Sequence, residues 1–168
     1  MCEEWIVQAE GLVKCFRGKG GNEDIYALDH LDLTLDRGCL TAMIGPDGAG
    51  KTTLMRLIAG LMVPTKGKLR VFGLDINGHE QEIQNRISYM PQKFGLYEDL
   101  TVMENLNLYA DLRSVHGVQR ASTFARLLDF TSLAPFTGRL AGKLSGGMKQ
   151  KLGLACTLVG VAGLRVKK

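Results

Sequence analysis

Hydrophobic and polar positions alternate through two segments near the start of the chain, residues 5–16 and 25–35. From 31 to 35 leucine occupies every second position, which is the period of a strand with one buried face. The glycine-rich stretch 18–22 separates the two segments. The pattern therefore predicts a β-hairpin.

A short apolar segment, 40–44, runs directly into a glycine-rich stretch at 45–53. Apolar residues then recur at helical spacing, and we expect Pro64 to end this helix. The positions that define the helical spacing are Leu54, Leu57, Ile58 and Leu61. Segment 40–44, together with 68–72 and 87–90, predicts three further short strands.

Helical patterns dominate the second half of the chain. Thr101 and Glu104 have the spacing of a capping box, so a helix is expected to begin there. A second helix is predicted around 122–130, followed by an irregular stretch at 135–142. A third helix, which is apolar, opens at 144–147 and continues through Leu152, Ala155, Cys156 and Val159.

Composition narrows the class of protein. A length of 168 residues suits one domain, and 45% hydrophobic with 23% charged residues excludes a disordered or fibrous chain. The longest apolar run, 152–164, is shorter than the ~20 residues of a membrane span, and the acidic start lacks the basic region of a targeting signal. We therefore expect a cytoplasmic protein with reduced cysteines, mostly in the core. The four cysteines are Cys2, Cys15, Cys39 and Cys156.

Charge is unevenly distributed although the net charge is only +4. Residues 130–168 contain no Asp or Glu. The seven basic residues there are Arg139, Lys143, Lys149, Lys151, Arg165, Lys167 and Lys168. This asymmetry indicates either a surface for nucleic acid or an anionic membrane, or a chain cut short before its next acidic residues. We favour the second interpretation.

The glycine-rich stretch has the spacing of a phosphate-binding loop, with Gly45, Gly50, Lys51 and Thr52 at the defining positions. Glycines let the backbone turn and approach phosphates closely, and the following helix start adds free amides. Lys51 would reach the β and γ phosphates, and Thr52 would offer an oxygen to Mg²⁺. The alternative is a glycine-rich turn between a strand and a helix.

A second glycine-rich helix start occurs at 144–147, with the sequence Leu-Ser-Gly-Gly. Its hydroxyl and free amides make it a second candidate phosphate site. Two such sites in one small chain favour a two-fold dimer in which each nucleotide is shared between subunits. Alternatively, Ser145 is only the N-cap of the helix.

Three motifs in this order, at 45–53, at Gln92 and at 144–147, resemble the Walker A, Q-loop and signature motifs of ATP-binding-cassette (ABC) ATPases. The resemblance extends from about residue 5 to residue 160. Within the family, the sequence is especially similar to bacterial drug-export subunits. It implies an α/β P-loop NTPase fold with an N-terminal antiparallel β region and a helical subdomain at about 98–145. The chain would be a single incomplete nucleotide-binding domain, lacking the C-terminal part of the core sheet, with an aberrant tail at 161–168.

The resemblance also assigns roles to matching positions. The nucleotide-binding positions are Phe16, Gly45, Pro46, Asp47, Gly48, Ala49, Gly50, Lys51, Thr52, Thr53 and Gln92. Thr52 and Gln92 would also contact Mg²⁺. The signature positions, expected to contact ATP held by the opposite subunit, are Leu144, Ser145, Gly146, Gly147 and Met148. Met148 replaces the commoner glutamine, a change that is not expected to abolish binding.

Several of these positions have simpler interpretations. Phe16 either stacks on adenine or is a core or hairpin residue. Gln92 either senses the γ-phosphate and Mg²⁺ or is a polar strand end. Phe94, Leu96 and Tyr97 either receive a helix of a membrane subunit or pack against the helical region.

The resemblance implies the ATP-binding subunit of a bacterial multidrug-type export transporter, with ATP and Mg²⁺ as cofactors. Its expected partners are an integral membrane permease subunit and either a second copy or a second ATP-binding domain. It would be cytoplasmic and peripheral to the inner membrane. No nucleic-acid partner is expected.

Members of the family follow the signature with a strand ending in Asp-Glu and later with a histidine. Here no acidic residue follows Asp129, and all three histidines precede the signature. A chain that keeps Lys51 and Thr52 without a general base could hold MgATP but hydrolyse it poorly. Two alternatives stay open: a non-catalytic ATP-binding regulatory module, and a soluble ABC ATPase that acts on nucleic acid or ribosomes through the basic C-terminus.

Overall fold

The computed structural model describes residues 5–18, 23–92 and 95–161. The chain divides into two compact units, Met1–Ile87 and Ser88–Lys168, and each is described by itself. Residues 19–22 of the expected hairpin loop, Phe94 and 162–168 of the expected tail lie outside the described residues. The first unit is a sheet with two helices, and the second is helical.

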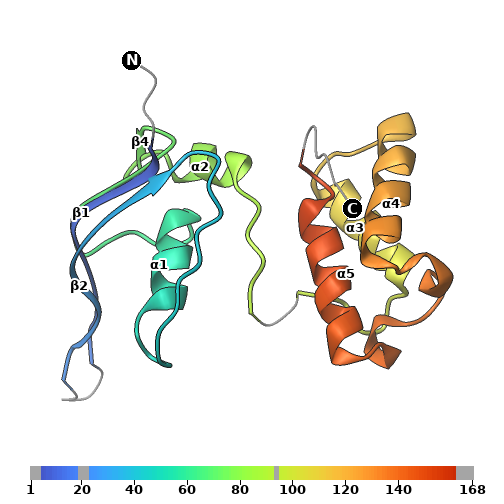
Figure 1. Ribbon diagram of the computed structural model, residues 1–168, viewed down its shortest axis with the longest axis horizontal. Helices are drawn as coiled ribbons and strands as arrows, with labels where there is room; N and C mark the ends of the chain where they lie inside the picture. The colour runs from blue at the N-terminus through green and yellow to red at the C-terminus, as the bar shows by residue number, and fades with distance from the viewer. Residues whose placement is uncertain (1–4, 19–22, 93–94, 162–168) are drawn as a thin grey trace. The chain divides into compact units, whose positions relative to one another are not determined.

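The predicted hairpin is present and forms one side of a four-stranded sheet, with β2 at the edge (Figure 1). Strand β1 (Trp5–Phe16) pairs antiparallel with β2 (Ile25–Asp36) on one side and with β3 (Lys66–Val71) on the other. The short strand β4 (Leu74–Asp75) completes the order β2-β1-β3-β4. Strand β3 begins two residues before the start that the sequence predicts.

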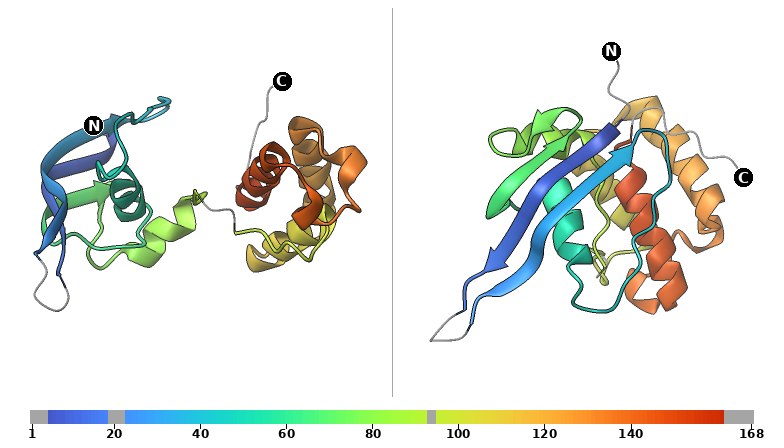
Figure 2. Two further views of the ribbon diagram at one scale, coloured as in Figure 1. Left: turned by 90° about the horizontal axis from the view of Figure 1, so that it is seen from below. Right: turned by 60° about the vertical axis from the view of Figure 1, so that its left-hand side comes forward.

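One face of this sheet is covered by helix α1 (Lys51–Ile58) (Figure 2). Helix α2 (Glu80–Arg86) adds Ile83 to the same hydrophobic core. Five side chains in it have no exposed surface, namely Leu12, Leu57, Leu69, Ile76 and Ile83. Burial of a large aliphatic side chain stabilises a fold by about 1.5–3 kcal/mol, so this cluster gives the first unit a core of its own.

Two of the predicted strands are wrong. Neither 40–44 nor 87–90 forms a strand, and Leu40 and Ile44 are almost fully exposed. A strand exists only when another strand satisfies its backbone hydrogen bonds, and local hydrophobicity does not supply that neighbour. The helix prediction also needs correction at its end, because α1 stops at Ile58 and leaves Leu61 half exposed, well before Pro64.

The described residues of the second unit form three α-helices, α3 (Val102–Leu112), α4 (Gly117–Thr131) and α5 (Gly146–Leu158). Two 3₁₀ turns, Ala134–Phe136 and Ala141–Lys143, lie in the stretch predicted to be irregular. The capping box is confirmed at the start of α3. The Thr101 hydroxyl accepts the Glu104 amide at 3.2 Å, and the Glu104 carboxylate accepts the Thr101 amide at 2.7 Å.

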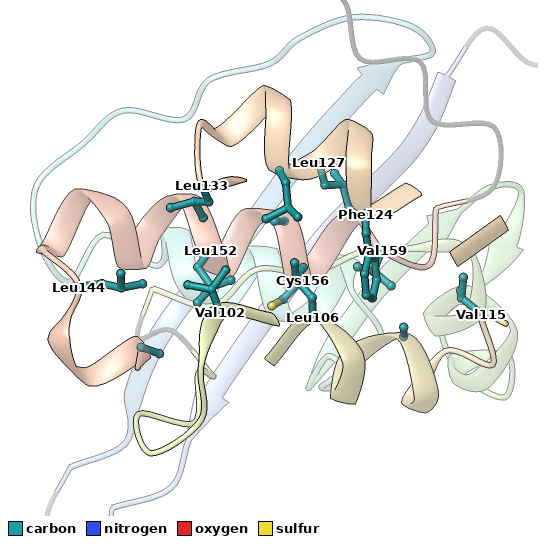
Figure 3. Packing of buried hydrophobic residues seen from close by; sticks show 14 residues of the cluster. Val102, Leu106, Val115, Phe124, Leu127, Leu133, Leu144, Leu152, Cys156 and Val159 are labelled. Atoms are coloured by element: carbon teal, nitrogen blue, oxygen red, sulfur yellow. The ribbon is translucent and has the colours of Figure 1, made fainter. Parts of the chain in front are cut away.

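The core of the second unit is drawn from all three helices (Figure 3). Leu106 of α3, Leu127 of α4 and Leu152 of α5 are fully buried in it. Cys156 lies among them, and burial raises the pKa of its thiol to about 12. The other described cysteines are half-buried Cys15 and exposed Cys39, so the expectation of mostly core cysteines holds only for Cys156. Among the helices that the structure describes, none has the length and apolar character needed to cross a membrane.

Candidate functional site

The phosphate-loop residues form a compact turn that leads into α1. Gly48 and Gly50 have positive φ angles of 82° and 81°, a region that favours glycine. At Gly50 a side chain is also excluded by packing, because a Cβ atom there would lie 2.2 Å from the carbonyl oxygen of Ala27 in β2. The loop therefore rests directly on the backbone of the sheet. Its other residues, 45–49, are exposed.

Lys51 bends back over this loop. Its Nζ atom donates hydrogen bonds to the carbonyl oxygens of Gly45 at 2.7 Å and Pro46 at 2.6 Å. The neighbouring Thr52 is exposed, Thr53 is half-buried, and no acidic residue occupies the first turn of α1. An ammonium group, the free amides of a helix start and the positive end of the helix dipole are thus gathered at one place, which suits an anion.

Phe16 lies at the end of β1, paired with Ile25 of β2, and is 39% exposed, so it is a hairpin residue and the core alternative is wrong. The Lys14 ammonium lies 5.4 Å from the centroid of its ring, within the range of a cation–π contact. A cavity of about 470 Å³ opens on the same sheet, but no predicted site residue lines it. Its lining residues are Val13, Cys15, Arg17, Asp24, Tyr26, His30, Thr65 and Lys66.

Gln92 belongs to the second unit, where it is exposed and lies in a bend. The alternative that it is a polar strand end is wrong, because 87–90 is not a strand. Of the apolar residues that follow, Leu96 packs against the helical core and Tyr97 is 56% exposed. The packing interpretation is therefore confirmed for Leu96.

The signature residues begin α5. Ser145 is the N-cap, as its simpler interpretation requires, and its Oγ accepts the amide of Met148 at 3.3 Å. Gly146 and Gly147 are exposed, and no other atoms would lie within 4 Å of a Cβ at either position. Leu144 is buried in the core of the helical unit. The free amides at the start of α5 are thus open to a ligand.

The structure reveals a further set of contacts that the sequence analysis missed. Asn105 of α3 is fully buried, and its Nδ2 donates to the carbonyl oxygens of Tyr97 at 3.0 Å, Leu100 at 3.2 Å and Thr101 at 3.0 Å. Its Oδ1 accepts the amide of Tyr97 at 3.0 Å. One helix turn later, the Tyr109 hydroxyl donates to the carbonyl oxygen of Gly95 at 2.5 Å. The sequence did contain one sign of these contacts: Asn105 is a polar residue on the apolar face of the predicted helix, between Val102 and Leu106.

Glu98 connects the same segment to the signature region. Its carboxylate forms an ion pair with Lys149 of α5 at 2.7 Å, and its carbonyl oxygen accepts the amide of Gly142 at 2.9 Å. The carbonyl oxygen of Leu100 accepts the amide of Ala141 at 2.8 Å. Because these partners are about 40 to 50 positions apart in the sequence, no local pattern indicated them.

The chain is similar in sequence to known ATP-binding proteins of ABC transporters. The family model for ABC transporters matches residues 28–165. The chain is 63% identical over 155 residues to the probable multidrug ABC transporter ATP-binding protein YbhF of Escherichia coli, covering 92% of this chain but 26% of that protein. It is 34% identical to the daunorubicin/doxorubicin resistance ATP-binding protein DrrA of Streptomyces peucetius, covering 91% of this chain and 44% of that protein. The chain therefore spans less than half the length of these relatives.

A solved structure with the same fold is a dimeric ATP-binding cassette in a post-hydrolysis state bound to ADP and Pi. The TM-score is 0.79 at 27% sequence identity, and the match covers 92% of this chain and 69% of that one. The fold class predicted from the sequence, an ABC-type P-loop NTPase with an antiparallel β region and helices, is confirmed by this likeness.

Proposed function

The chain belongs to the ABC transporter family of ATP-binding proteins, and from this premise we propose that it binds ATP with Mg²⁺ through the phosphate loop at 45–53. We also propose that the complete protein acts as the ATP-binding subunit of a bacterial multidrug-type exporter. The names of the relatives support this assignment, since one is a probable multidrug transporter protein and another a daunorubicin/doxorubicin resistance protein.

The observation that carries the proposal is the position of Lys51. Its ammonium group lies over the loop on two carbonyl oxygens, next to the free amides at the start of α1. A triphosphate bound on those amides would offer the ammonium stronger, charged acceptors than the carbonyl oxygens. Thr52, at the second position of the helix, would hold Mg²⁺ with its hydroxyl, which is the kind of hard oxygen ligand that Mg²⁺ prefers. Bound Mg²⁺ neutralises charge on the phosphates.

Phe16 and Gln92 complete the proposed nucleotide contacts. The exposed ring of Phe16 is available to stack on adenine, which would favour ATP over other nucleotides. Exposed Gln92 would contact the γ-phosphate and Mg²⁺.

We further propose that the signature residues contact a nucleotide held by a second ATP-binding domain. The open start of α5 around Ser145, Gly146 and Gly147 supports this, and so does the dimeric arrangement of the solved cassette. The other proposed partner is an integral membrane permease subunit, which would place the protein in the cytoplasm against the inner membrane.

Thermal unfolding with increasing MgATP tests the proposal. A ligand that binds only the folded state raises its stability, by about 2.7 kcal/mol at a concentration 100 times its dissociation constant. The wild-type chain is expected to gain stability with MgATP, and Lys51→Ala is expected to lose this gain. Lys66→Ala, which removes an exposed lysine from β3 of the same unit, is the matched control and should respond as the wild type does. An equal gain in Lys51→Ala would contradict the proposal.

A further inference from the structure

The segment 95–101 follows Gln92 and is held firmly by α3. Asn105 binds both the amide and the carbonyl group of Tyr97 as well as the carbonyl oxygen of Leu100. The Tyr109 hydroxyl binds the carbonyl oxygen of Gly95. Asn105 is fully buried and all of its hydrogen-bonding atoms have partners, so displacing the segment would leave a buried polar group unsatisfied.

The same segment also contacts the chain on both sides of Ser145. Before Ser145, the amide of Gly142 donates to the carbonyl oxygen of Glu98, and a Cβ at Gly142 would lie 3.1 Å from that same oxygen. After Ser145, the Lys149 ammonium pairs with the Glu98 carboxylate at 2.7 Å. One residue, Glu98, therefore holds both the entry to α5 and its first turn.

Such a double attachment matters because binding groups act only within a narrow range of positions, about 0.5 Å. Ser145 is exposed, and a Cβ at Gly146 or Gly147 would meet no other described atom within 4 Å. Their position depends on the burial of Leu144 and α5 in the core, on the Ser145 cap, and on the contacts of Gly142 and Lys149 with Glu98.

We infer that Glu98 is a positioning residue for the signature motif. Through the amide of Gly142 and the ammonium of Lys149, it holds Ser145–Gly147 in the geometry that contacts a nucleotide, and Asn105 fixes the backbone from which Glu98 acts. The inference rests on the proposed function for what the motif contacts. The attachment itself depends only on the contacts within the helical unit.

Amide hydrogen exchange of the full chain tests the attachment. The amides of Gly142, Met148 and Lys149 are all hydrogen-bonded at the start of α5, so their exchange reports on its position. The Lys149 side chain is 22% exposed and that of Glu98 is 65% exposed, so the pair is partly screened by solvent. Glu98→Gln and Lys149→Met should each accelerate exchange at these amides about two- to fivefold, and the double variant no further.

The charge-swapped variant, Glu98→Lys with Lys149→Glu, is expected to return the three exchange rates toward the wild-type values, since it restores the pair with opposite polarity. Glu82→Gln, which removes the ion pair of Glu82 with Arg86 in α2, is the matched control and should leave these amides unchanged. Wild-type exchange rates in Glu98→Gln, or no recovery in the charge-swapped variant, would overturn the inference.

MgATP-driven self-association provides the functional measurement. Glu98→Gln should require about two- to fivefold more protein to associate, in the same direction as Ser145→Ala, while its affinity for MgATP as a monomer stays that of the wild type. A loss of monomer affinity equal to the loss of association would overturn the positioning role. If the wild-type chain does not associate in MgATP, the shared-nucleotide part of the proposed function is wrong, and the amide exchange alone decides whether Glu98 holds the motif.

Discussion

Gly50 is the residue at which the phosphate loop is most tightly constrained. It combines a φ of 81° with a backbone carbonyl oxygen 2.2 Å from the place of a Cβ atom, whereas Gly48 has a φ of 82° and open space around it. The two glycines therefore separate the cost of an unfavourable dihedral angle from the cost of a collision.

Replacing each of these glycines by alanine should give different results. Gly48→Ala is expected to lower the free energy of unfolding of the first unit by about 1–2 kcal/mol, the cost of a left-handed residue with a Cβ. Gly50→Ala should cost more than Gly48→Ala, because the loop must also move away from Ala27. Chemical denaturation followed by the fluorescence of the single tryptophan, Trp5 in β1, measures both values. Equal losses in the two variants would contradict the packing argument.

Residues of the phosphate loop could be predicted from the sequence because their spacing is a local pattern. Asn105 and Glu98 could not, since the role of each depends on which distant backbone groups the fold brings to it. The sequence does place Asn105 on the apolar face of α3, and a buried amide needs partners, but it does not say which ones.

Among the described helices, α3 is the one whose N-terminus is closed by a full capping box. Hydrogen bonds from the Thr101 amide, and then from its hydroxyl, lower the pKa of the Glu104 carboxyl below its ordinary value of 4.5. A carboxyl with a lowered pKa in the folded state stabilises that state at pH values above its unfolded pKa. This contribution is lost as the pH falls through the folded value.

The helical unit should therefore lose part of its stability below about pH 4.5, as Glu104 becomes protonated. Glu104→Gln should already lack this contribution at neutral pH, so the difference between the two proteins should shrink as the pH falls. Thermal unfolding followed by far-ultraviolet circular dichroism measures the difference. A difference that stays constant from neutral pH to about pH 3 would show that the carboxylate does not stabilise α3 through its charge.

Elements defined by local signals are the ones that the sequence predicts well. The hairpin β1–β2, the capping box of α3 and the serine N-cap of α5 each depend on residues close together in the chain. The segments 40–44 and 87–90 were misassigned because an apolar run becomes a strand only with a partner strand. The end of α1 was misplaced because Gly60, with a φ of 71°, leaves the helical conformation before Pro64.

At the scale of the whole molecule, the two compact units each contain a hydrophobic core, and an apolar segment of the first unit stays uncovered. Leu40 and Ile44 are almost fully exposed, and Met43 is 41% exposed. Segment 40–44 therefore presents apolar side chains on a stretch that is not part of the sheet, and exposed apolar surface promotes association between chains.

Ile44→Lys should reduce concentration-dependent association of the chain in the absence of nucleotide, because it adds a charge to this exposed segment. Val118→Lys replaces another highly exposed apolar residue, on α4, and is the control for a general effect of added charge. Light scattering over a range of protein concentrations measures the association. Equal reductions in both variants would assign the effect to net charge instead of to segment 40–44.

The central claim is that MgATP binds at the phosphate loop, and amide hydrogen exchange with and without MgATP tests it most directly. Protection is expected at the amides of 48–53 and at no comparable level in β3 and β4, and it should disappear in Lys51→Ala. Protection that spares 48–53, or that persists in Lys51→Ala, would contradict the claim.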